Sequence, residues 1–66
     1  MMFAIKISNK LDFLLLQKQL NKFNITLNDK QLSIKHYIKN VYYIIDTKNK
    51  TVVRKSKCPN IPVYNK

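Results

Sequence analysis

Basic residues alternate with tyrosine in the second half of the chain, and this pattern is the clearest chemical signal in the sequence. Lys35, Tyr37 and Lys39 stand at every second position. The segment 48–57 adds further candidate contacts, namely Lys48, Lys50, Arg54, Lys55 and Lys57. Lysine and arginine neutralise phosphate groups, and a tyrosine ring stacks on an unpaired base. These residues therefore predict a binding site for RNA or another nucleic acid.

The charge balance of the whole chain supports a polyanionic partner. Thirteen lysine and arginine residues stand against three aspartates, which gives a net charge of +10 in 66 residues. Such charge opposes a compact fold through self-repulsion. Nucleic acid is the first candidate partner, followed by an acidic protein surface and then an anionic membrane. Lysine is a point charge rather than a planar fork, so we expect weakly sequence-specific contacts to phosphate.

The residues that could catalyse a reaction are few. Asp12, Asp29 and Asp46 all stand where capping or a turn explains them. His36 lies on the apolar phase of its segment and is expected in the core, and Cys58 is expected as a partly buried thiol. The absence of glycine excludes phosphate loops that depend on it. We expect no enzyme; the alternative, a metal-free ribonuclease, predicts cleavage that disappears in His36→Ala.

Cysteine and histidine usage also limits the cofactors. One cysteine and one histidine cannot form a disulfide or a Cys/His metal cluster within a monomer, so no metal and no cofactor are expected. The longest apolar run, 13–16, is too short to span a bilayer, and the N-terminus does not resemble a signal peptide. We therefore expect no membrane partner and a reducing, cytoplasmic location. A core this small favours homo-oligomers.

The elements that would position the basic residues begin with a hairpin. Residues 41–46 and 51–55 are rich in β-branched and aromatic side chains and are predicted as two strands. The loop 47–50 is short enough for an antiparallel connection, with Asn49 expected at positive φ. An isolated hairpin is only marginally stable, so it must pack on another element.

The N-terminal third supplies that element. Residues 2–8 alternate apolar and polar side chains, as a half-buried strand does. Asn9 is expected to cap a helix that runs to about Phe23, with Asp12 in its first turn. The stripe of this helix that should face the core consists of Phe13, Leu16, Leu20 and Phe23. Three further leucines lie on the other side: Leu11, Leu14 and Leu15. Either a loop or the tail covers them, or they form a homodimer interface.

The middle and the end of the chain are harder to interpret. Residues 25–27 are consistent with a short extended piece, and residues 28–29 with a turn or a second N-cap. Residues 31–38 fit both a strand and a helix, and we favour the strand. Pro59 and Pro62 make residues 58–66 an extended tail. The predicted fold is thus one α+β domain, 1–57, of order β-α-β-β-β, with the helix packed on an antiparallel sheet; the alternative order is β-α-α-β-β.

Two segments, FAIKISNKLDFLLLQKQLNKF and VYYIIDTKNKTVV, together resemble small accessory proteins of tailed bacteriophages. That resemblance covers residues 3–54 and implies a role in host takeover or counter-defence. Within this class the charge matches the RNA-binding inhibitors of RNA-dependent toxin–antitoxin systems. We therefore expect an RNA-binding antagonist of a host defence. The alternative is a protein-only inhibitor that docks its Lys-rich surface on an acidic host protein.

Overall fold

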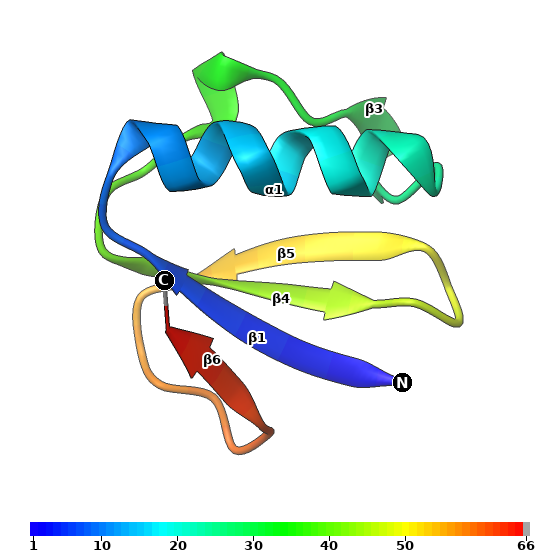
Figure 1. Ribbon diagram of the computed structural model, residues 1–66. Helices are drawn as coiled ribbons and strands as arrows, with labels where there is room; N and C mark the ends of the chain where they lie inside the picture. Colours follow the sequence, from blue (N-terminus) through cyan, green and yellow to red (C-terminus); the bar gives the residue numbers. More distant parts are fainter. Residues whose placement is uncertain (66) are drawn as a thin grey trace.

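A computed structural model describes residues 1–65 as one helix on a mixed sheet (Figure 1). The elements in chain order are β1 (Met2–Ile7), α1 (Lys10–Lys22), β2 (Thr26–Leu27), β3 (Lys30–Gln31), a 3-10 helix η1 (Ile34–His36), β4 (Val41–Asp46), β5 (Thr51–Lys55) and β6 (Val63–Asn65). The strands form one sheet in the order β3-β2-β5-β4-β1-β6. The α+β class and the packing of a single α-helix on one sheet are confirmed.

The sheet is not antiparallel throughout, which corrects the prediction. Its centre, β5-β4-β1, is antiparallel as expected, but β6 joins β1 in parallel and β2 joins β5 in parallel. The reason is the path of the chain after β5: residues 56–62 cross β4 and β1 to reach the far edge of the sheet (Figure 1). There Ala4 N donates to Pro62 O at 2.8 Å. The segment expected as an extended tail therefore supplies a strand.

Helix α1 begins and ends through side-chain and backbone caps. The side chain of Asn9 accepts a hydrogen bond from Asp12 N at 2.9 Å, as its type and position predicted. At the other end Asn24 adopts a left-handed conformation with φ of 59°. Ile25 N then donates to Leu20 O at 2.9 Å, in the arrangement of a Schellman motif. This motif stops the helix and directs the chain into β2.

The core lies between α1 and one face of the sheet. Phe13, Leu16 and Leu20 are buried as predicted. They pack against buried side chains of the strands and of the segment after the helix: Ile7, Ile25, Leu27, Leu32, Tyr43, Ile45 and Val52. Phe23 was expected among them, but it is 57% exposed. It is the C-cap residue, so the chain turns away before its ring can reach the centre of the sheet.

Residues 31–38 do not form the predicted strand. Strand β3 ends at Gln31, and the chain then makes the 3-10 turn η1, with Ile34 and Ile38 each 45% exposed. Tyr37 instead packs inward, with its ring centroid 5.4 Å from that of Phe13. The turn also stands where the alternative order placed a second helix, but it is a single turn of three residues.

Side chains stabilise this irregular segment because it has no strand partner. The buried Tyr43 hydroxyl accepts from Ile38 N at 2.8 Å and donates to His36 O at 3.2 Å. Arg54 donates to the same His36 carbonyl at 3.1 Å. His36 Nδ1 accepts from Ser33 N at 2.9 Å, which caps the turn. A strand pattern in the sequence does not reveal such partners.

Four of the five left-handed backbone positions in residues 1–65 fall on asparagine or aspartate, since the chain has no glycine. Asn28 and Asp29 both have positive φ and make the two-residue turn between β2 and β3. In the β4–β5 loop the prediction of Asn49 is wrong, because Lys50 takes positive φ, at 56°. The Asp46 carboxylate accepts from Asn49 N at 3.1 Å, which holds Asn49 inside the turn.

The role of Tyr43 in holding the 36–38 segment can be tested with Tyr43→Phe. Removing the hydroxyl leaves Ile38 N–H without its partner, and we expect a loss of about 1–3 kcal/mol in the free energy of unfolding. Urea unfolding followed by circular dichroism measures it. Tyr64→Phe is the matched control, since Tyr64 is 52% exposed; it should change stability by less than about 0.5 kcal/mol. Equal losses in both variants would contradict this role.

The strained position of Lys50 predicts a stabilising substitution. Lys50→Gly removes the steric cost of a left-handed β-carbon, and we expect the free energy of unfolding to rise by roughly 0.5–1 kcal/mol. Lys48→Gly is the control for the lost charge, because Lys48 does not have positive φ. A thermal melt in which Lys48→Gly stabilises as much as Lys50→Gly would show that relief of charge repulsion, not strain, is responsible.

Candidate nucleic-acid interface

Three residues on adjacent strands form a row across the sheet face opposite α1. Tyr42 pairs with Lys6 of β1 on one side and with Lys55 of β5 on the other. Side chains of paired residues point to the same face, and adjacent strands are about 4.8 Å apart. Because its neighbour Tyr43 is buried under α1, Tyr42 points to the opposite face. The row therefore places one aromatic ring between two cations.

Neighbouring side chains contact the Tyr42 ring and favour the neutral form of its hydroxyl. Lys6 Nζ lies 5.6 Å from the centroid of the Tyr42 ring, within the range of a cation–π interaction. Hydrogen bonding with the neighbouring Cys58 thiol, followed by burial, raises the pKa of the Tyr42 hydroxyl above its ordinary value of 10.0. The phenol is therefore neutral at physiological pH, and the crossing segment 56–62 borders its position.

The next row of this face is apolar. Ala4, Ile44 and Val53 pair across the same three strands. Ala4 is fully buried, whereas the Val53 side chain is exposed. The third row contains Asp46, but its carboxylate is engaged by the backbone and side chain of Asn49, which hold its pKa below the ordinary value. The cationic end of the face thus continues into apolar surface.

Some of the basic residues singled out in the sequence lie near this row. Lys55 belongs to it, and Lys57 immediately precedes Cys58. Lys39 lies at the same end of the sheet, because its neighbour Asn40 donates a backbone hydrogen bond to Ile7 O at 2.9 Å. All three lysines are exposed.

The other predicted contacts lie elsewhere. Tyr37 packs in the core, and no strand aligns it with Lys35 and Lys39 as the alternation suggested. Arg54 pairs with Tyr43 and so points to the helix side of the sheet, where it binds His36 O. Lys48 and Lys50 occupy the β4–β5 loop, at the opposite end of the hairpin from Lys55. The predicted residues therefore do not form one continuous site.

Sequence analysis did not single out Lys6 or decide between Tyr42 and Tyr43. Lys6 lies on the polar phase of β1, so its outward position could have been inferred from the alternation. In β4 the pairs Tyr42–Tyr43 and Ile44–Ile45 make both faces apolar, so periodicity cannot assign a tyrosine to either one. Only the position of α1 distinguishes them.

A second group of cations surrounds His36 on the other side of the molecule. Burial lowers the pKa of His36 below 6.5, and the charges of Lys35, Arg54 and Lys30 lower it further. The hydrogen bond that its Nδ1 accepts from Ser33 N requires the unprotonated nitrogen. His36 therefore stabilises a turn, and it is not the packed core residue that the apolar alternation suggested.

The leucines considered for self-association are exposed. Leu11 is 69% and Leu15 is 55% exposed, and Leu14 is also classed with the exposed residues. Of the three, only Leu15 lines the groove between α1 and β1. Dimer formation through these residues stays a prediction.

Within residues 1–65 the structure contains no cluster of three or more metal-ligating side chains. The same part of the chain has no helix long and apolar enough to cross a membrane. No protein-family model, curated protein or solved structure matches this chain. Functional assignment therefore depends on the physical properties of the surfaces described above.

The His36 cap predicts a defined pH dependence of stability. Its folded-state pKa lies below the unfolded value, so stability is fully present above about pH 6.5 and falls as the pH drops below it, because the unfolded chain binds the proton more readily. The pKa of Asp46 is also lowered, from an ordinary value of 3.8. The stability that Asp46 contributes is therefore lost only below about pH 4, outside the range in which His36 titrates.

Urea unfolding at pH 7.5 and pH 5.0 measures this effect. His36→Asn is the control, because its side-chain oxygen can accept the Ser33 hydrogen bond without titrating. We expect the wild type to lose stability between these two pH values and the variant to change much less. The same loss in both proteins would show that other groups cause the pH dependence.

Proposed function

We propose that this protein binds single-stranded RNA with weak sequence preference, through the sheet face centred on Tyr42. The observation that carries the proposal is the row of Lys6, Tyr42 and Lys55 on three adjacent strands, in a chain of net charge +10. A half-buried aromatic ring between cations on one face of a sheet matches the needs of an unpaired base with phosphates on either side.

In this mode of binding the Tyr42 ring stacks on a base, and the two lysines of the row neutralise the adjoining phosphates. Lys39 and Lys57 extend the positive charge at the same end of the sheet. Stacking accepts any base, and ammonium groups contact phosphate without reading base edges. Affinity should therefore depend strongly on salt and only slightly on sequence.

The biological role that we propose is antagonism of a host antiviral defence, such as an RNA-dependent toxin–antitoxin system. This role is supported by the resemblance of residues 3–54 to phage accessory proteins. It places the protein in the cytoplasm of an infected bacterium and requires no enzymatic activity, because occupation of the RNA is sufficient. The competing protein-only inhibitor would instead use its lysines against an acidic host protein.

A salt titration of a fluorescein-labelled 12-nucleotide RNA tests the proposal with the nuclease-treated protein. Each lost phosphate contact should reduce the slope of log affinity against log salt by about 0.7. We expect this change in Lys55→Glu. Tyr42→Ala should weaken binding by about 1–3 kcal/mol with little change in slope. Lys48→Glu is the matched control, since it makes the same charge change at the far end of the hairpin.

Two results would overturn this proposal. Absence of binding even at low salt would favour the acidic protein partner. Equal losses in Lys48→Glu and Lys55→Glu, with none in Tyr42→Ala, would indicate attraction by net charge alone. A single-stranded DNA of the same sequence completes the experiment, because tighter binding to DNA would contradict RNA as the ligand.

A further inference from the structure

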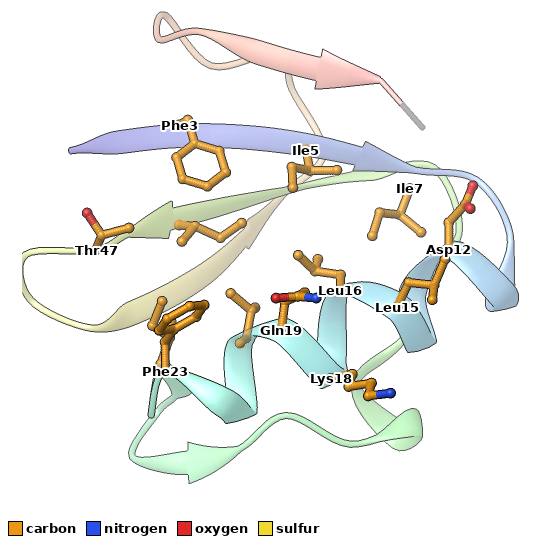
Figure 2. Close-up of a pocket in the computed structure, with 13 residues that line it drawn as sticks. Phe3, Ile5, Ile7, Asp12, Leu15, Leu16, Lys18, Gln19, Phe23 and Thr47 are labelled. Carbon is orange, nitrogen blue, oxygen red and sulfur yellow. The ribbon is translucent and has the colours of Figure 1, made fainter.

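A long apolar groove lies on the other face of the sheet, between α1 and β1 (Figure 2). Its volume is about 610 Å³. Phe3 and Ile5 extend into it from β1, and Leu15 and Gln19 of α1 line it together with the C-cap residue Phe23 (Figure 2). These helix residues are spaced by four, so they form one stripe along the helix.

The groove exists because one helix is too narrow to cover this sheet. A helix with its side chains is about 10 Å wide and covers about two strands, which are spaced at about 4.8 Å. The buried side chains of Tyr43, Ile45 and Val52 show that α1 lies over β4 and β5. On β1, Phe3 and Ile5 are only partly buried, and the exposed Tyr64 of β6 packs edge-on against Phe3 at 5.8 Å.

From the geometry and charge of this groove, we propose that it binds an acidic amphipathic helix of a partner protein. Between Asp12 and Phe23 the groove follows α1 for about 17 Å, which is the length of a three-turn helix at 1.5 Å per residue. A second helix in this position would lie beside α1 and cover the apolar strip of β1. Its apolar face would contact Leu15 and Phe23 of α1 together with Phe3 and Ile5 of β1.

The cations at the groove define the charge of the partner. Lys18 lines the groove, and Lys22 Nζ lies 5.9 Å from the Phe23 ring centroid. Lys50 lines a hollow of about 300 Å³ that shares Phe23 with the groove. The carboxylate at the opposite end, Asp12, already accepts a hydrogen bond from Asn9 Nδ2 at 2.9 Å. Glutamates or aspartates on the polar side of the incoming helix would therefore face lysines.

The same charges disfavour a second copy of this chain as the occupant. Each copy has a net charge of +10, and its own α1 contains Lys10, Lys18 and Lys22. Packing two such helices together would bring like charges into contact, which costs stability. An acidic partner removes that repulsion, whereas self-association increases it.

Fluorescence anisotropy with designed 14-residue peptides tests this inference on the full chain. The first peptide has leucine at helical spacing on one face and glutamate on the other, the second replaces every glutamate by lysine, and the third replaces every leucine by glutamine. We expect the acidic leucine peptide to bind at least tenfold more tightly than either of the others. Binding should weaken at least tenfold in Leu15→Ser and in Phe23→Ser.

Leu11→Ser is the matched control, because Leu11 is exposed on the same helix but does not line the groove. All three substitutions remove an exposed side chain, and melting curves verify that each variant is folded. Lys55→Glu, on the opposite face, should bind the acidic peptide within about twofold of the wild type. RNA binding by Phe23→Ser should also stay within about twofold of the wild type, which separates this inference from the proposed function.

Three outcomes would overturn the inference. Equal affinity for the acidic and the basic leucine peptides would remove the charge argument. Equal weakening in Leu11→Ser and Phe23→Ser would exclude the groove as the binding site. Sedimentation equilibrium that shows a wild-type dimer, dissociated by Phe23→Ser, would identify a second copy as the occupant.

Discussion

The hydrogen bonds of the buried Tyr43 hydroxyl join the central strand of the sheet to the segment that precedes it. The ring fills the core beside Phe13, and the hydroxyl reaches the backbone of residues 36 and 38. Burial raises the pKa of this hydroxyl, so it remains a neutral donor and acceptor. Since an unpaired polar group in this position would be costly, the path of the 33–40 segment depends on one side chain. That path in turn packs Tyr37 against Phe13. Tyr42, the neighbour of Tyr43 in β4, lies on the opposite face of the sheet.

Several features of this fold were predictable because they depend on neighbours in sequence. The Asn9 cap, the buried stripe at Phe13, Leu16 and Leu20, and the hairpin strands all follow from local preferences and periodicity. The strand predicted for residues 31–38 was wrong because a strand period and a helix period fit this segment equally well. Its conformation is set by hydrogen bonds from Tyr43 and Arg54, which lie later in the chain. The parallel pairing of β6 with β1 was likewise hidden, since nothing in a short strand specifies a partner across the sheet.

The candidate interface shows the same division between local and distant information. Composition directed attention to lysine and tyrosine, but a linear sequence cannot tell which of them share a face. The predicted group separated into residues near Tyr42, residues of the hairpin loop and residues around His36. The row of Lys6, Tyr42 and Lys55 can be recognised only from the register of three strands. One of its members, Lys6, comes from the N-terminal strand. Net charge suggested a class of ligand to propose, whereas strand register showed which lysines lie beside Tyr42.

The position of β1 between β4 and β6 also constrains when the sheet can form. One edge of β1 pairs with β4, and the other pairs with β6, whose last residue is Asn65. Because β1 precedes both partners in the chain, one of its edges stays unpaired during synthesis until residue 46 is made and the other until residue 65 is made. Unpaired edges recruit other strands, and non-local pairing is slow. At a net charge of +10, electrostatic repulsion between two nascent chains would oppose such recruitment.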